Sequence, residues 1–310
     1  MLNLVFMGTP AFSVPVLDSL AKAHRVKLVV TQPDKPKGRG QKLAMPPVKE
    51  KALELGLPVA QPESLKSPEF HKLIEEQKAD LLVVVAFRIL PATLFPLSRM
   101  GAVNIHGSLL PKYRGAAPIQ WAVANGDSET GVTIFQLDAE VDHGKILAQE
   151  KTAIGPEETA GELFARLSVM GRDLLLRTLK DLETGIAVPK EQDHLHATPA
   201  PKLKKEDGAI DWKLSATVLH NRIRGFNPYP LCHTTEKESG RVLRIHRASV
   251  VAGEAPTEPG VLYLDAAQHP LISAGNGSLR LLEVQWEGKP KISGIDFVNG
   301  LRGAEGFRFG

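Results

Sequence analysis

Residues 81–87, LLVVVAF, and residues 102–106, AVNIH, are two apolar runs separated by a segment that contains two prolines. Apolar runs without alternation are typical of strands that are covered on both faces, as in parallel sheets. Similar runs occupy residues 2–6 and 26–30, with helical patterns at 48–56 and 68–79 between the runs. This order predicts βαβ units and therefore an α/β fold with a mostly parallel, Rossmann-like sheet. The runs at 132–138 and 145–154 predict an antiparallel hairpin at one edge of that sheet.

The pattern changes in the second half of the chain. Thr159 and Glu162 form a capping-box pair that predicts the start of a long helix, and Gly185 predicts its end. A polar, proline-bearing stretch follows, and from residue 209 one short helix (about 214–225) precedes several short strand-like runs at barrel-like spacing. We therefore expect an α/β domain over 1–188, a linker over 189–208 and a β-barrel domain over 209–310.

Composition narrows the class of protein. The net charge of the 310 residues is only +3, so no global field selects a partner. Cys232 is the only cysteine, which excludes an internal disulfide and favours a reducing compartment. The N-terminal run has no positive region before it and two prolines interrupt it, and no apolar stretch is long enough to span a membrane. We expect a cytoplasmic protein without a metal site, because the histidines show no ligand spacing.

Polar side chains stand where the run at 102–106 ends. Asn104 and His106 are two positions apart, so a strand places them on one face, at the carboxyl end where open α/β sheets bind ligands. Asp142 follows in the polar turn EVDHG. An amide and an imidazolium can both donate to a developing oxyanion, and a carboxylate can orient the imidazole, which is what acyl transfer to an amine requires. The alternative is a satisfied buried pair and an ordinary turn aspartate.

Several common catalytic patterns are missing from the sequence. Gly8 stands alone after the first run, without the G-x-G-x-x-G fingerprint of dinucleotide sites, and no phosphate loop is present. There is no G-x-S-x-G elbow, and Cys232 lies in no catalytic motif. A dehydrogenase is therefore a distant alternative.

The run NIHGSLLPKYRGAAPIQ (104–120), followed by GVTIFQLDAEVDHGKIL (131–147), closely resembles the folate-dependent formyltransferases. The resemblance implies 10-formyltetrahydrofolate as co-substrate, without a metal, and a catalytic trio. It places that trio on Asn104, His106 and Asp142. The segment VVVAFRILP (83–91) resembles the family's pterin-pocket loop but is one residue shorter than its usual form. The folate contacts that the resemblance implies are Ser108, Leu109, Leu110, Pro111, Phe87 and Ile89.

Two further segments resemble one branch of this family. TQPDKPKGRGQKL (31–43) is similar to the basic loop with which the members that formylate methionyl initiator tRNA reach the acceptor stem. AIDWKLSATVLHNRIRGFNPYP (209–230) is similar to the entry of their second domain, an open, OB-like barrel. The resemblance implies formyl transfer to the amine of methionyl initiator tRNA in translation initiation, by a protein that we expect to be monomeric. The tRNA-binding residues that it implies are Lys35, Lys37, Arg39 and Lys42.

Other readings stay open at this point. A sugar-nucleotide amine formyltransferase shares the catalytic core and has a related second domain, but has no use for the basic loop. A glycinamide-ribonucleotide enzyme lacks a second domain of this size. A non-catalytic RNA-binding protein is a further class, and a basic loop is by default only a solvated surface. The basic track could extend over Lys202, Lys204, Lys205, Arg222, Arg224, Arg241, Arg244 and Arg247.

Overall fold

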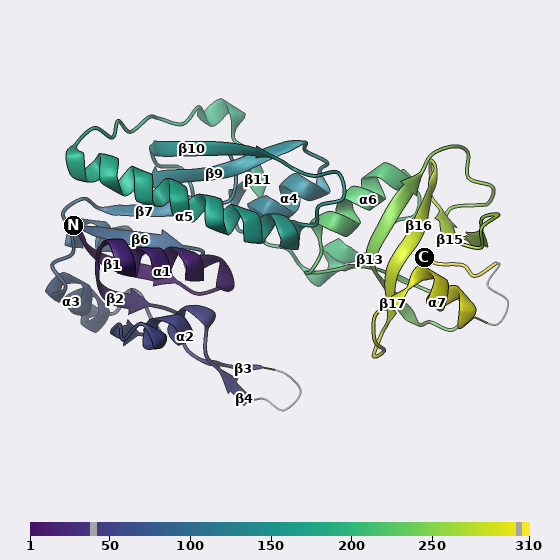
Figure 1. The fold of residues 1–310 in the computed structure, drawn as a ribbon, viewed down its shortest axis with the longest axis horizontal. Coiled ribbons are helices and arrows are strands. Elements are labelled where there is room, and N and C mark those ends of the chain that lie inside the picture. Colours follow the sequence, from purple (N-terminus) through teal and green to yellow (C-terminus); the bar gives the residue numbers. More distant parts are fainter. Residues whose placement is uncertain (38–41, 302–305) are drawn as a thin grey trace. The chain divides into compact units, whose positions relative to one another are not determined.

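A computed structural model describes residues 1–37, 42–301 and 306–310 (Figure 1). The described chain divides into two compact units. The first unit consists of Met1–Pro118, Glu129–Ala153 and Phe164–Ala200, and the second of Ile119–Ser128, Ile154–Leu163 and Pro201–Gly310. Among the residues described, no helix combines the length and the apolar character needed to cross a membrane.

The first unit is built on a seven-stranded sheet in the order β10-β9-β7-β6-β1-β2-β5. Strands β7, β6, β1, β2 and β5 run parallel, whereas β9 pairs antiparallel with both β7 and β10. The predicted mostly parallel sheet and its antiparallel edge are thus confirmed. Its strands are β1 (Asn3–Gly8), β2 (Arg25–Val30), β5 (Val59–Ala60), β6 (Leu81–Val85), β7 (Ala102–His106), β9 (Glu129–Gln136) and β10 (Ile146–Ala153).

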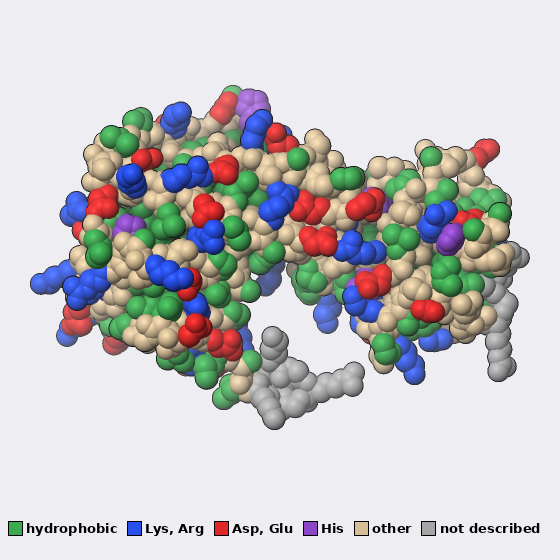
Figure 2. Space-filling view, viewed as in Figure 1, with side chains coloured by type: hydrophobic (Ala, Val, Ile, Leu, Met, Phe, Trp, Pro, Cys, Tyr) green, Lys and Arg blue, Asp and Glu red, His purple; other side chains and the backbone are tan. Residues whose placement is uncertain are grey.

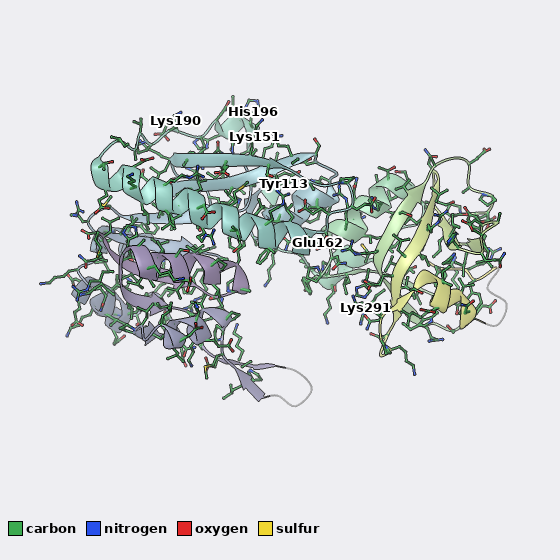
Figure 3. The ribbon with its side chains drawn as sticks, in the orientation of Figure 1. Tyr113, Lys151, Glu162, Lys190, His196 and Lys291 are labelled. Atoms are coloured by element: carbon green, nitrogen blue, oxygen red, sulfur yellow. The ribbon has the colours of Figure 1, made fainter. Side chains whose placement is uncertain are left out.

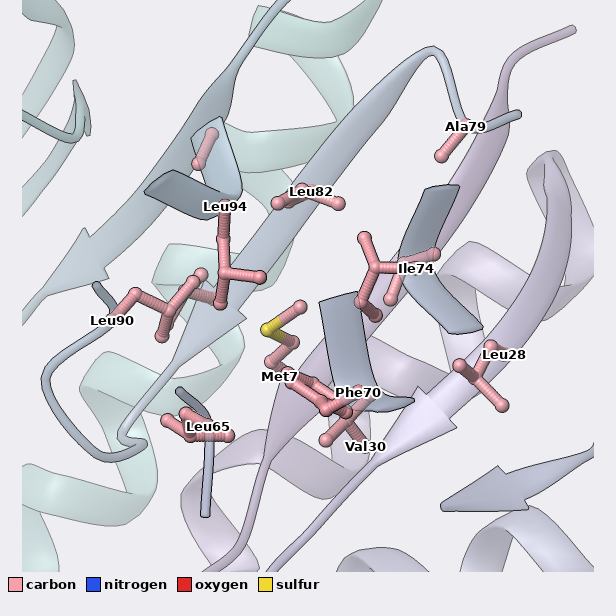
Figure 4. Close-up of a cluster of buried hydrophobic side chains, with 13 residues drawn as sticks. Met7, Leu28, Val30, Leu65, Phe70, Ile74, Ala79, Leu82, Leu90 and Leu94 are labelled. Atoms are coloured by element: carbon pink, nitrogen blue, oxygen red, sulfur yellow. The ribbon is translucent and has the colours of Figure 1, made fainter. Parts of the chain in front are cut away.

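Helices cover both faces of this sheet. On one face α3 and a 3-10 segment close an apolar cluster around Met7, Phe70 and Leu82, all of them buried (Figure 4). On the other face Phe164 of the long helix α5 packs against Phe12 at 4.8 Å between ring centroids. The helices of this unit are α1 (Val14–Ala23), α2 (Pro47–Glu54), α3 (Pro68–Glu76) and α5 (Ala160–Thr184), of which α5 begins in the second unit, with 3-10 segments at Ala11–Ser13, Ala92–Leu97 and His194–His196. Helix α4 (Pro118–Ala124) belongs to the second unit from Ile119 onward.

The ends of α5 follow the predicted signals. The backbone N–H of Glu162 donates to Thr159 Oγ1 at 3.3 Å, and the N–H of Thr159 donates to the Glu162 carboxylate at 2.8 Å. This reciprocal pair satisfies donors that the first turn of a helix leaves free. Gly185, which follows the last helical residue, has a φ of +74°, the left-handed conformation that ends many helices.

Short strand pairs complete the first unit. A hairpin formed by β3 (Lys35–Lys37) and β4 (Lys42–Ala44) projects from the body of the unit (Figure 1). Further along the chain, β8 (Arg114–Gly115) pairs in parallel with β11 (Pro199–Ala200). Residues 190–200, which composition assigns to the start of a linker, are therefore hydrogen-bonded into the first unit.

The second unit carries a curled antiparallel sheet in the order β12-β13-β16-β15-β14, with β17 beside β16. Buried Leu243, Ile245, Leu279 and Leu281 alternate along its two longest strands, and so form an inward face. The predicted open β-barrel is confirmed. Its elements are a 3-10 segment (Lys205–Gly208), α6 (Ala216–Gly225), β12 (Cys232–Thr235), β13 (Val242–Val251), β14 (Leu262–Leu264), β15 (Pro270–Ser273), β16 (Ser278–Trp286), β17 (Ile292–Ser293) and α7 (Gly294–Asn299).

Candidate active site

The site forms where β7 ends, at the carboxyl edge of the parallel strands. Asn104 pairs with Val84 of β6 on one side and with Phe135 of β9 on the other, and His106 pairs with Thr133. The strand therefore lies inside the sheet, and its buried neighbours fix the direction of both polar side chains. As the two-residue spacing predicts, Asn104 and His106 project from the same face of β7.

His106 is buried, and each of its ring nitrogens faces a different group. Nε2 lies 2.8 Å from the Tyr113 carbonyl oxygen, which can only accept, so Nε2 carries a hydrogen and donates it. Nδ1 lies 3.7 Å from Asp142 Oδ2. The edge of Phe135 packs near the ring at 6.4 Å between centroids. The sequence prediction that Asp142 accompanies His106 thus matches the geometry of the structure.

Asp142 approaches His106 from the loop between β9 and β10. It is 8% exposed, and its Oδ2 accepts the backbone N–H of Gly115 at 2.8 Å. Its φ of +54° lies in the left-handed region, which costs a residue with a Cβ about 1–3 kcal/mol and persists only where surrounding contacts hold it. Gly144 follows in the same loop, and a Cβ there would overlap the Gln136 carbonyl oxygen. The D-x-G pattern therefore has a steric reason: the loop turns tightly to bring the carboxylate to His106.

The amide of Asn104 has a buried oxygen without a partner. Oδ1 accepts no hydrogen bond from any described residue, although it is shielded from solvent. A buried polar atom without a partner costs about 1–3 kcal/mol, so it is retained where a ligand can complete it. Together with the His106–Asp142 pair, this open acceptor fits a hydrogen-bond donor such as the N–H of a substrate amine.

Residues 108–111 form a loop that the sheet holds firmly. Thr133 Oγ1 donates to the Ser108 carbonyl at 2.7 Å and accepts the Leu110 N–H at 3.1 Å. Gln149 Nε2 donates to the Leu110 carbonyl at 2.8 Å. Of the expected folate contacts here, Leu110 is buried, Leu109 and Pro111 are half-buried, and the Ser108 hydroxyl donates to the Lys112 carbonyl at 2.6 Å. The Ser108 side chain is thus committed within the loop.

The loop after β6 begins beside Asn104, because β6 and β7 are parallel neighbours. Phe87 is half-buried against the apolar cluster of Figure 4, whereas Ile89 is 77% exposed. Arg88 anchors the loop: its guanidinium donates to the carbonyls of Glu63 and Pro62 at 2.9 and 2.8 Å. Burial lowers the pKa of Arg88 from its usual value. The short 86–91 loop is thus fixed by its own arginine.

The predicted basic loop coincides with the β3–β4 hairpin. Backbone pairing joins Lys37 to Lys42, and Lys35 is exposed, while Arg39 lies outside the described residues. Asp34, the one acidic residue in this stretch, is paired with Lys49 at 2.6 Å, and this bond lowers the pKa of its carboxyl. The Asp34 carboxylate is therefore already paired within the described part of the chain, with Lys49 of α2.

Outside the hairpin, basic and acidic side chains occur together on the surface. Figure 2 shows basic and acidic side chains interspersed over the face in view. In the second unit Arg244 pairs with Glu287 at 3.0 Å, and Arg247 pairs with Glu162. Arg224 is buried and donates to the carbonyl of Gly155. The expectation that Arg224 extends a basic surface track is therefore wrong, because its side chain is buried and hydrogen-bonded within the second unit.

The part of the chain that the structure describes contains no group of three or more His, Cys, Asp or Glu side chains able to hold a metal ion. Burial raises the pKa of the Cys232 thiol to about 12, so its sulfur stays protonated and unreactive. At the site itself, Asn104, His106 and Asp142 can supply hydrogen-bond donation, charge stabilisation and proton handling.

Sequence reasoning did not identify the groups that surround this trio. The Tyr113 carbonyl and the Gly115 N–H are backbone atoms and leave no mark in the sequence. Thr133 and Gln149 support the 108–111 loop from neighbouring strands, and the only available signal was a polar residue within a strand pattern. Gln192 lies in a stretch that composition assigns to a linker, yet its side chain is buried.

Comparison with known proteins agrees with this geometry. Residues 2–179 match the family described as formyl transferase, and residues 202–302 match its C-terminal domain. The methionyl-tRNA formyltransferase of Solibacter usitatus is 47% identical over 311 residues, covering 100% of this chain and 99% of that protein. That of Geobacter metallireducens is 45% identical over 311 residues, with the same coverage of both chains.

A solved structure shares the fold. WlaRD, a sugar 3N-formyl transferase crystallised in the presence of dTDP and 5-N-formyl-THF, superposes with a TM-score of 0.67 and covers 94% of this chain and 99% of its own. Its sequence is 18% identical, so it supports the fold alone.

Proposed function

The chain belongs to the methionyl-tRNA formyltransferase family, and we propose that it transfers the formyl group of 10-formyltetrahydrofolate to the amine of methionyl initiator tRNA in translation initiation. The observation that carries the site assignment is the buried His106–Asp142 pair next to the unpartnered amide oxygen of Asn104. We take these three residues as catalytic. The donor, when bound, supplies an activated formyl group, and the rest of the chemistry falls to the protein.

Charge develops on the formyl oxygen as the amine adds to the formyl carbon. Asn104 can turn its amide N–H toward that oxygen, and His106 can donate from Nδ1, because Nε2 is already committed to the Tyr113 carbonyl. A separation of 3.7 Å is too long for a strong hydrogen bond, so Nδ1 stays available to the reacting group. Asp142 orients the ring and stabilises its protonated form by charge. The bond between the formyl carbon and the folate nitrogen then breaks, the folate nitrogen gains a proton, and the attacking amine loses one.

Folate binding is assigned to the two loops beside this trio. We propose that Ser108, Leu109, Leu110 and Pro111 line one side of the folate and that Phe87 and Ile89 line the other. The hydrogen bonds from Thr133 and Gln149 support this assignment, because they hold the 108–111 loop rigid. Since the Ser108 hydroxyl already donates within the loop, toward the folate it can only accept.

The tRNA is assigned to the basic hairpin and the barrel. We propose that Lys35, Lys37, Arg39 and Lys42 contact the phosphates of the acceptor stem, supported by the engagement of Asp34 with Lys49. Residues 1–188 then belong to the catalytic domain and 209–310 to the tRNA-binding domain, while residues 190–200 of the expected linker 189–208 are hydrogen-bonded into the first unit. We expect a monomer that acts in the cytoplasm.

Formyl transfer to three acceptors in parallel tests this function. The acceptors are methionyl initiator tRNA, a UDP-linked 4-amino sugar and glycinamide ribonucleotide, with 10-formyltetrahydrofolate as donor. We expect turnover of the charged tRNA alone. Turnover of a small acceptor in its place would keep the chemistry but contradict the proposed role of hairpin and barrel. The absence of turnover with all three acceptors, while the protein still binds the folate, would favour a non-catalytic RNA-binding protein.

Arg39→Ala tests the hairpin within the same assay. Loss of one phosphate contact should raise KM for the tRNA, leave KM for the folate unchanged, and reduce the slope of log affinity against log salt by about one. Arg25→Ala is the matched control, because Arg25 is an exposed arginine at the opposite end of β2 from the loop that leads to the hairpin. Equal tRNA affinity of the two variants would refute the assignment of the hairpin.

A further inference from the structure

Residues 190–200 cross from the edge strand β10 to the loop that follows His106. Lys190 exchanges two backbone hydrogen bonds with Ile146 of β10, at 2.7 and 2.8 Å. Eight residues later, the N–H of Thr198 donates to the Pro111 carbonyl, and its own carbonyl accepts from Arg114. Figure 3 labels Lys190 and His196 on this segment and Tyr113 on the loop with which it pairs. The segment is thus a strap across the catalytic loops, fixed at both ends.

Gln192 is the residue of this strap that turns inward. Its side chain is 4% exposed, and all of its amide groups are used. Nε2 donates to the Asp142 carbonyl at 3.0 Å and to the Gly144 carbonyl at 2.8 Å. Oε1 accepts from Arg114 Nε at 3.2 Å and from Nη2 at 2.7 Å. Carbonyl groups only accept and a guanidinium only donates, so these partners allow a single orientation of the amide.

These bonds join the two loops that hold His106. One loop contains Asp142, the carboxylate beside Nδ1, in a left-handed conformation that needs external support. The other contains Tyr113 and Gly115, which bind His106 Nε2 and the Asp142 carboxylate. Gln192 donates to two backbone carbonyls of the first loop and accepts from Arg114 in the second loop. A single side chain therefore bridges the loop that carries the carboxylate and the loop that binds the imidazole.

We propose that Gln192 is a positioning residue that holds Asp142 against His106. It touches neither substrate and acts through the Asp142 backbone. The inference rests on the proposed function, since it assumes that the His106–Asp142 pair is catalytic. A merely structural role would require only that a buried polar group be satisfied. A positioning role further requires that the loss of Gln192 affect turnover through Asp142.

Gln192→Ala and Gln192→Glu test this in the full-length protein. Ala removes all four hydrogen bonds, while Glu keeps the volume and the acceptor toward Arg114 but loses both donors. We expect each variant to lower kcat about 10- to 100-fold, with KM for both substrates within about threefold of wild type, as is usual when support of a catalytic group is lost. Gln77→Ala is the control, because Gln77 donates its side-chain amide to the Leu73 carbonyl at the end of α3.

The decisive measurement repeats Gln192→Ala in an Asp142→Ala background. If Gln192 acts through Asp142, the second substitution lowers kcat by less than about twofold further, because residues that act as one unit are not additive. Full additivity would overturn the proposal, as would a normal kcat in both single variants, or a loss confined to KM. Should Gln192→Ala fail to fold, the isosteric Glu variant carries the test alone. Inactive wild type would contradict the proposed function, whereas active wild type with insensitive variants would contradict only the role of Gln192.

Discussion

The two ring nitrogens of His106 differ in their partners: Nε2 makes a short hydrogen bond and Nδ1 does not. The Tyr113 carbonyl accepts from Nε2 at 2.8 Å and fixes the ring, whereas Nδ1 faces a carboxylate at 3.7 Å without a short hydrogen bond. A backbone carbonyl is neutral and carries no charge that opposes that of an imidazolium. A carboxylate is negatively charged and can stabilise an imidazolium. The catalytic role that we propose for His106 therefore resides in Nδ1, and the bond at Nε2 serves orientation.

His106→Ala removes both functions at once. We expect kcat to fall by about 10²–10³, the usual cost of losing one donor to a developing oxyanion, while the affinity for tRNA is unchanged. Steady-state kinetics with methionyl-tRNA and a filter-binding assay measure the two quantities. His71→Ala is the matched control, since His71 lies on α3, where its Nε2 is 3.4 Å from the Thr93 hydroxyl. Near-normal turnover of His106→Ala would contradict the catalytic assignment.

At the scale of elements, the site depends on how the loop between β9 and β10 closes. The two strands form an antiparallel pair, so the loop must reverse direction and still project the Asp142 carboxylate toward the end of β7. Gly144 makes this possible because its backbone passes against the Gln136 carbonyl, where no Cβ fits. The position of the carboxylate is thus a property of the hairpin and of its neighbouring strand.

Gly144→Ala tests this dependence. The added methyl group overlaps a backbone carbonyl that cannot rotate away, so we expect a loss of about 1–3 kcal/mol in unfolding free energy and a lower kcat. Gly300→Ala, at the end of α7, is the control, because its φ is −82° and a Cβ there meets its nearest atom at 3.4 Å. Thermal unfolding and kcat measured on both variants decide the matter. If the two variants have the same unfolding temperature and the same kcat, the close approach of Gly144 to the Gln136 carbonyl does not affect function.

At the scale of the whole molecule, each unit contains a histidine whose pKa is lower than its ordinary value in the folded chain. Burial lowers the pKa of His24 in the first unit. In the second unit, burial lowers the pKa of His246 by more than its hydrogen bond with Gln285 raises it. A histidine whose pKa is lower in the folded state binds more protons when the chain unfolds. Its contribution to stability is therefore lost as pH falls below the unfolded value of about 6.5.

Thermal unfolding should accordingly shift to lower temperature between about pH 7.5 and about pH 5.5. Carboxyls with a lowered pKa, such as Asp80, whose oxygen accepts from the Asn3 N–H, add to this only nearer pH 4. Replacing His24 and His246 with Gln removes the titrating groups and should flatten the profile in the upper window. A profile that stays equally steep in the double variant would show that other groups govern the acid response.

The sequence alone determined the features that depend on near neighbours in the chain. Continuous apolar runs predict the parallel sheet, because strands covered on both faces cannot alternate. The spacing of Asn104 and His106 places them on one face, and the capping pair at Thr159 marks the start of α5. Each of these follows from a period or a contact of a few residues, so the chain carries the signal locally.

Only the tertiary structure decided what surrounds the proposed catalytic trio. Asp142 reaches His106 across 36 positions of the chain, and Gln192 reaches Asp142 across 50. Composition assigns residues 190–200 to a linker because they are polar, yet here the polarity serves buried hydrogen bonds with loop carbonyls. Such partners are set by the pairing of distant strands and by unmarked backbone atoms, and no local pattern encodes either of them.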